Sequence, residues 1–222
     1  MSNSLTAIPP PQSIGHRSQN LWLGFISLVA IWFIAKYAIR YYLPGVPVNS
    51  VQTGLTWARR LTLLGHISGG MVALLAGPWQ FSGALRRGYP RAHRITGRVY
   101  LAAVGLGGVA ALSLATTTSL GWAWGFGVGT LAAVWLATSG MAFYAIVHKQ
   151  IKAHQEWMRR SYIATFAFVT VRLLGDTPPM SHLQPAHDVL ITTIWVCWVL
   201  PMFALEVIVQ LREFRQSAFS RS

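Results

Sequence analysis

The chain has 222 residues, of which 53% are hydrophobic and only 10% are charged. A typical soluble domain carries about 25% charged residues, so this composition argues against a soluble protein. Lys and Arg number 18 against 5 Asp and Glu, a net charge of +13 that would suit a nucleic-acid-binding protein. Three long segments without any charge exclude that class: 18–35, 61–85 and 99–148. Since a helix needs about 20 mostly apolar residues to cross a bilayer, the sequence predicts a multi-pass membrane protein.

The apolar segments predict an all-α fold, an integral membrane bundle of six transmembrane helices over residues 21–211. Residues 1–20 are expected to form a flexible tail and residues 212–222 a basic tail. A proline lies inside two of the spans, and Pro78 is expected to kink the second near its end. The expected spans are, in chain order, Leu21–Tyr42, Arg60–Gly83, Ile95–Thr116, Trp124–Val147, Trp157–Gly175 and Asp188–Leu211.

The basic residues predict the orientation of the bundle. With both termini in the cytoplasm, thirteen Lys and Arg residues fall on the inner side and five on the outer side. Short cytoplasmic loops carry the excess of basic residues in membrane proteins. We therefore expect a multi-pass protein of the plasma (inner) membrane with both termini cytoplasmic. Its inner basic residues would attract anionic lipid, and Glu206 is expected to pair with one of the arginines.

Histidines within or beside the spans are the main candidates for function, because polar residues in a membrane are costly and often functional. His66 lies six residues into the second span. Gly70, Ala73 and Gly77 follow on the same helical face. This face would accept either a flat ligand or a second helix packed on the small residues.

Four histidines fall into two layers across the expected bundle. His66 and His187 lie in the outer layer, and His93 and His154 in the inner layer. Two bis-histidine haems stacked across a membrane need such an arrangement. The alternatives are that His93 is an interfacial histidine in a basic loop, with Gly97 one turn beyond it, and that His187 is a surface histidine.

A polar stripe is predicted on the fifth span, which begins with AHQEWMRRSY. From His154 the same face carries Met158, Ser161, Thr165 and Arg172, and this face is expected to line the bundle interior.

Arg172 is the one arginine expected deep in a span, where Asp176, one turn later, or Asp188 would be its partner. The pair would either lock two helices together or bind a carboxylate-bearing ligand such as a haem propionate or a quinone.

Three stretches resemble a bacterial family of predicted membrane proteins known as domain of unknown function 2306: HISGGMVALLAGPWQF, RAHRITGRVYL and HQEWMRRSYIATFAFVTVR. The resemblance spans about Leu61 to Gly175 and implies a multi-pass membrane fold. The layered histidines are more distantly similar to the ascorbate-reducible transmembrane cytochromes b, which hold two haems in a four-helix core. The chain departs from that pattern because its fourth span has no histidine in the outer half, so His187 would have to be the partner of His66.

The leading functional hypothesis is transmembrane electron transfer by haem b, with a redox partner or quinone. A transporter that uses Arg172 and Asp176 is an alternative, although the chain lacks the internal repeats common in transporters. A structural accessory subunit without a cofactor is another. An intramembrane zinc hydrolase is disfavoured because no HExxH motif is present. The single cysteine, Cys197, excludes an intrachain disulfide.

Overall fold

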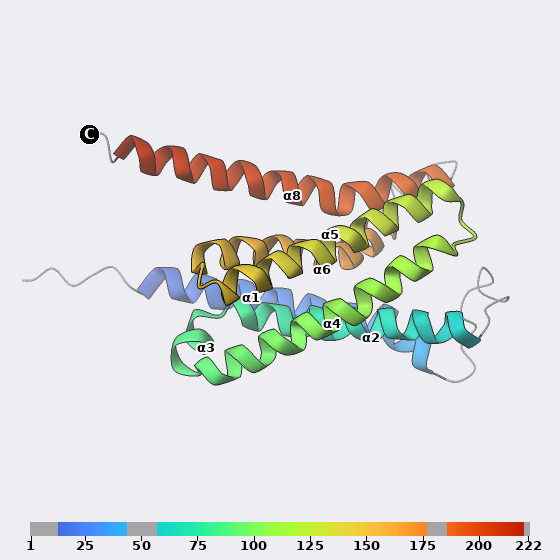
Figure 1. Ribbon diagram of the computed structural model, residues 1–222, viewed down its shortest axis with the longest axis horizontal. Coiled ribbons are helices and arrows are strands. Elements are labelled where there is room, and N and C mark those ends of the chain that lie inside the picture. Colours follow the sequence, from blue (N-terminus) through green and yellow to red (C-terminus); the bar gives the residue numbers. More distant parts are fainter. Residues whose placement is uncertain (1–12, 44–56, 177–185, 220–222) are drawn as a thin grey trace, which may run out of the picture.

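The computed structural model describes residues 13–43, 57–176 and 186–219, and gives the backbone alone for 13–19, 186–187 and 218–219. Within these ranges the chain forms helices joined by short turns and contains no strand. The long helices run side by side along the longest axis of the molecule (Figure 1). They are α1 (Ser13–Phe33), α2 (Trp57–Phe81), α4 (Pro90–Thr116), α5 (Trp122–Val147), α6 (Ile151–Gly175) and α8 (Ala186–Phe219).

Five helical segments are long and apolar enough to cross a membrane: Asn20–Tyr42, Trp57–Phe81, Pro90–Thr116, Trp122–Val147 and Asp188–Ser217. They correspond to five of the six expected spans. The sixth, expected at Trp157–Gly175, lies in α6, whose 25 residues include several charges. Other helices cover much of α6, and residues such as Ser161, Ala164 and Val169 have no exposed surface. Its position therefore depends on helix packing as well as on its own hydropathy.

Several boundaries differ from the sequence prediction. Helix α1 begins at Ser13, within the expected N-terminal tail, and α8 continues to Phe219, within the expected C-terminal tail. Neither segment contains a proline that would end the helix. The chain also forms a short helix, α3 (Gly83–Gly88), that the prediction missed, although Ser82 caps it by accepting a hydrogen bond from the Leu85 amide at 3.2 Å.

The end of the first span is irregular. A π-helix, η1 (Ile34–Ala38), follows α1 directly, and a 3-10 helix, η2 (Ile39–Tyr42), completes the segment. The π-helix contains Lys36 and the buried Tyr37. Such π-helical turns within longer helices often occur at functional sites.

Helices α2 and α4 pack closely through small residues. A Cβ atom built on Gly69 would lie 2.6 Å from the Ala103 carbonyl oxygen and 2.7 Å from the Gly107 nitrogen. These are backbone contacts, so the two helix axes approach more closely than any side chain at position 69 would allow. This is the close packing that small residues permit between membrane helices.

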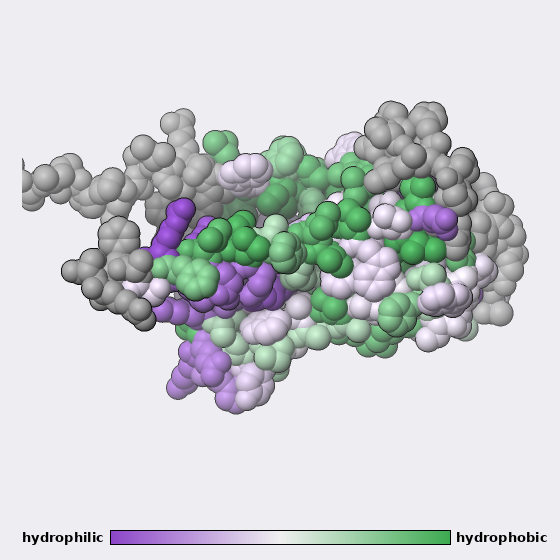
Figure 2. All heavy atoms as spheres, turned by 90° about the horizontal axis from the view of Figure 1, so that it is seen from above, coloured by the Kyte–Doolittle hydropathy of each residue, from purple (hydrophilic) through white to green (hydrophobic). Residues whose placement is uncertain are grey.

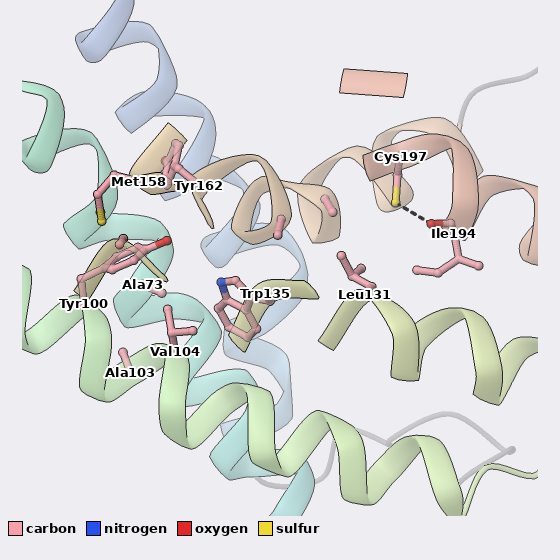
Figure 3. Close-up of a cluster of buried hydrophobic side chains, with 13 residues drawn as sticks. Ala73, Tyr100, Ala103, Val104, Leu131, Trp135, Met158, Tyr162, Ile194 and Cys197 are labelled. Atoms are coloured by element: carbon pink, nitrogen blue, oxygen red, sulfur yellow. Dashed lines mark hydrogen bonds between the residues drawn. The ribbon is translucent and has the colours of Figure 1, made fainter. Parts of the chain in front are cut away.

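The buried core lies where α2, α4, α5, α6 and α8 meet (Figure 3). Tyr100, Trp135 and Leu131 are buried completely or nearly so, and Cys197 with Ile194 closes the cluster on α8. In the view of Figure 2 hydrophobic residues dominate the middle of the molecule. Most hydrophilic residues gather toward the end where α4 and α6 begin.

Candidate functional site

His66 is held at the contact between α2 and α4. Its Nδ1 lies 2.9 Å from the Gly107 carbonyl oxygen, and its ring meets the Phe168 ring edge to face at 5.0 Å between centroids. In the tautomer with the proton on Nδ1, this N–H donates a hydrogen bond to the Gly107 carbonyl oxygen. The Nε2 atom is then available as an acceptor or metal ligand. Histidines that bind metals are oriented by this kind of hydrogen bond.

The small-residue face below His66 is filled by the chain itself. A Cβ atom on Gly77 would overlap the Tyr162 ring, so this glycine accommodates an aromatic side chain of α6. Ala73 is fully buried, whereas a Cβ atom on Gly70 would have no neighbour within 4 Å. Of the two alternatives left open by the sequence, helix packing therefore explains the lower part of this face.

His93 and His154 lie close to each other at the beginnings of α4 and α6. His154 is near enough to act electrostatically on His93, as is Arg86. The His154 Nδ1 lies 2.8 Å from the Ala142 carbonyl oxygen of α5, which fixes the ring and leaves Nε2 for another partner. The His93 Nδ1 is buried and has no hydrogen-bond partner among the described residues. The two inner histidines thus lie at the same end of the bundle (Figure 1), and the His93 Nδ1 atom has no partner among the described residues. Their binding of a cofactor stays a prediction.

Gly97, one turn beyond His93, does not leave room for a ligand. A Cβ atom there would lie 3.0 Å from the Gln80 Oε1 atom of α2. Gln80 is buried, and its Nε2 donates to the Thr96 Oγ1 atom at 2.7 Å. Gly97 therefore serves the contact between α2 and α4.

The expected outer pair of His66 and His187 is not established by the described residues. The backbone of His187 belongs to the first turn of α8, and its side chain lies outside the described residues. Helix α8 packs on α6 and α5, which in Figure 1 separate it from α2. The side chain of the neighbouring Asp188 is exposed. The inner pair is therefore the better-defined candidate.

A buried hydrogen-bond network lies beneath the inner pair. The Tyr100 hydroxyl contacts the Ser161 Oγ atom at 2.6 Å and the Thr165 Oγ1 atom at 2.8 Å. Ser161 also contacts the Ser139 Oγ atom at 2.6 Å, and the Trp135 indole donates to Thr165 Oγ1 at 2.8 Å. Figure 3 shows Tyr100 and Trp135 pointing into the space between their helices. Three helices, α4, α5 and α6, are joined by these contacts.

The network satisfies its own hydrogen-bonding groups. In one consistent arrangement Ser139 donates to Ser161, Ser161 to Tyr100 and Tyr100 to Thr165. The Thr165 hydroxyl then donates to the Ser161 backbone carbonyl at 2.9 Å. Since this carbonyl cannot pass a proton on, the network fits a structural connection better than a proton path.

Met158, Ser161 and Thr165, which the sequence predicts on the interior face of the fifth span, are all buried. Tyr100, Ser139 and Trp135, which form the rest of the network, were not predicted. The position of Tyr100, two turns after His93 on the same face, was a usable signal. Trp135 lies in the middle of its expected span, and nothing in the sequence distinguished it from Trp32, Trp195 and Trp198, which do the same.

The expected pairing of Arg172 with Asp176 does not occur. Arg172 is exposed in the last turn of α6, where neighbouring helices no longer cover it. Asp176 instead accepts a hydrogen bond from the Tyr37 hydroxyl of the π-helix. Arg160 forms an ion pair with Glu206 at 2.6 Å, which confirms that Glu206 pairs with an arginine. A transport site that uses Arg172 and Asp176 stays a prediction, in which the two side chains would not be paired with each other.

Replacing Tyr37 with Phe is expected to loosen the end of the first span. The ring of Tyr37 is buried and its hydroxyl binds the Asp176 carboxylate, so the change removes one hydrogen bond to a charged group. Because Asp176 is exposed and water will replace the lost donor, the cost should be about 1 kcal/mol. Thermal unfolding in detergent would measure it. Tyr41→Phe is the matched control, and an equal loss of stability in both variants would contradict the role of the Tyr37 hydroxyl.

A family model described as "Predicted membrane protein (DUF2306)" matches residues 63–209, which is more than half of the chain. The chain belongs to this family. The match includes α4, α5 and α6 in full, and with them the inner histidine pair and the buried network. Helix α1 and the π-helix lie outside it. No curated protein and no solved structure matches the chain significantly, so the more distant likeness to cytochromes b has no support from these comparisons.

Proposed function

We propose that the protein binds one haem b between His93 and His154 and transfers electrons within the membrane. The observation that carries this proposal is the closeness of two histidines from different helices, next to the buried His93 Nδ1 atom that has no partner among the described residues. An iron atom ligated by imidazole would supply a partner for the pair. When bound, such a haem would supply one-electron chemistry.

The contacts around the pair fit the role of ligands. The Ala142 carbonyl holds His154 through Nδ1, as the outer contacts of metal-binding histidines usually do. Arg86 acts electrostatically on His93 and is a candidate partner for a propionate, because arginine pairs well with carboxylates. The tightly filled face below His66 offers less room, so we assign a haem to the inner pair alone.

The proposed orientation follows from the basic residues. Those near α3, at the turn between α5 and α6 and near the end of α8 belong to the same end of the bundle (Figure 1). Short cytoplasmic loops are rich in such residues. We place this end of the bundle, and both termini, in the cytoplasm. We also propose that α6 is a sixth transmembrane span and that the protein lies in the inner membrane. Anionic lipids at that surface would be attracted to the basic residues, and the electron partner would be a quinone or a redox protein.

The visible spectrum of the purified protein tests the proposal. We expect a Soret band that sharpens and shifts on reduction with dithionite, together with resolved α and β bands. His93→Ala and His154→Ala should each abolish these bands, because each removes one of the two histidines that would hold the haem. The protein should be produced in cells with ample haem and purified in mild detergent.

His148→Ala is the matched control. His148 is exposed at the end of α5 on the same side, and its Nδ1 contacts its own helix at the Tyr144 carbonyl oxygen, 2.8 Å away. This variant should keep the full spectrum. A featureless spectrum from folded wild-type protein would refute the proposal, as would full retention of the bands in both His93→Ala and His154→Ala.

A further inference from the structure

We infer that Tyr100 is a positioning residue whose hydroxyl fixes the register of α4 against α6 and thereby keeps His93 opposite His154. The functional importance of this role rests on the proposed haem site, but the geometry itself does not. Tyr100 is completely buried, and it bonds two side chains of α6 that are one turn apart, Ser161 and Thr165. A slide of α6 by one turn in either direction would lose at least one of these bonds.

The spacing along the two helices relates this contact to the histidines. Tyr100 lies seven residues after His93, and Ser161 lies seven residues after His154. Helices α4 and α6 run in the same direction, since α5 connects them as an antiparallel neighbour (Figure 1). Seven residues make about two turns, or about 10 Å, and return to nearly the same face. The contact of Tyr100 with Ser161 therefore places the two histidines at one level, on facing sides of their helices.

Helix α5 contacts the same face of α6, and we call this row of contacts between α5 and α6 the α5–α6 seam. Trp135 bonds Thr165, Ser139 bonds Ser161, and the Ala142 carbonyl bonds His154. These contacts advance along α5 as they go back along α6, as expected for antiparallel helices with one fixed register. The bond between the Ala142 carbonyl and His154 is thus the last of three contacts between α5 and α6, and Tyr100 connects α4 to the same part of α6. Helix α4 also packs on α5, where Gly107 meets Trp135 and Gly108 meets Leu136. Loss of the Tyr100 hydroxyl would therefore leave α6 joined to α4 through α5 alone, without the direct side-chain bonds that fix α4 against α6.

Cross-linking of the full-length protein in native membranes tests this inference without any haem. The parent protein carries Cys197→Ala, which removes the single native cysteine, together with His93→Cys and His154→Cys. A short bismaleimide should join the two introduced thiols and protect them from later labelling with a mass tag. Tyr100→Phe and Ser161→Ala in this parent should each lower the yield severalfold, whereas Tyr144→Phe, whose exposed side chain lies outside the network, should leave it unchanged.

A second cysteine pair separates a register shift from general loosening. A Cβ atom on Gly65 would lie 3.8 Å from the Leu106 side chain, so Gly65→Cys with Leu106→Cys reports on α2 against α4. Tyr100→Phe should leave this second yield unchanged. The inference is overturned if the parent pair at 93 and 154 does not cross-link, if Tyr100→Phe cross-links as well as the parent, or if both pairs lose yield equally. A featureless spectrum would refute the haem proposal while leaving these yields unaffected.

Discussion

Replacing Gly69 with Ala is expected to destabilise the protein strongly, because the added methyl group would meet backbone rather than side chains. Its nearest neighbours would be the Ala103 carbonyl oxygen at 2.6 Å and the Gly107 nitrogen and Cα atoms at 2.7 and 2.8 Å. Backbone atoms yield only if the whole of α4 moves. Overpacking of this kind costs about 1–3 kcal/mol and sometimes more, and thermal unfolding in detergent would measure it.

The neighbouring Gly70 supplies the matched control. A Cβ atom there has no neighbour within 4 Å, so Gly70→Ala adds a methyl group without a clash. Alanine is favoured over glycine within a helix by about 0.5–1 kcal/mol, and this variant should be as stable as the wild type or more stable. Equal loss of stability in both variants would contradict the close approach of α2 to α4. Gly69→Ala should also disturb His66, whose Nδ1 contacts the Gly107 carbonyl across the same interface.

The sequence predicted features that depend on one helix at a time. The length and hydropathy of the apolar runs predicted the helices, and the family resemblance is confirmed by the match over residues 63–209. The faces of α6 were also predictable, because Ser161 and Thr165 follow from the 3.6-residue period alone. The beginnings of α4 and α6, which carry His93 and His154, lie at one end of the bundle (Figure 1), whereas the role of these histidines as ligands stays a prediction.

Features that depend on the register between helices were not predictable. Asp176 was assigned to Arg172 because the two lie one turn apart, yet its partner is Tyr37, 139 residues away in the chain. The glycine face below His66 suited a flat ligand as well as a helix, and the Tyr162 ring that occupies it comes from α6. The boundaries of α1 and α8 differed for another reason, since a helix continues beyond the apolar region when no residue ends it.

Trp135→Ala is expected to be the most destabilising single change in the helix bundle. The indole of Trp135 is fully buried, lies 3.2 Å from a Cβ atom built on Gly107, and meets the Phe168 ring at 5.9 Å between centroids. Its Nε1 atom also donates to Thr165. Truncation of a buried tryptophan costs about 3–5 kcal/mol. Since lipid is as apolar as the protein core, the loss here comes from packing contacts and the hydrogen bond rather than from water exclusion, which places it near the lower end of that range.

Two further variants separate the contributions to this loss. Trp135→Phe keeps an aromatic ring but removes the donor to Thr165, so it should cost less than Trp135→Ala and at least the value of one hydrogen bond, about 1 kcal/mol. Trp122→Ala removes an indole that is 85% exposed and should change the unfolding temperature little. If Trp135→Ala proved no more harmful than Trp122→Ala, the three helices could not be joined at Trp135. Other contacts would then have to hold α6 in register with α5, because Trp135 and Ser139 are the two α5 side chains that bond the interior face of α6.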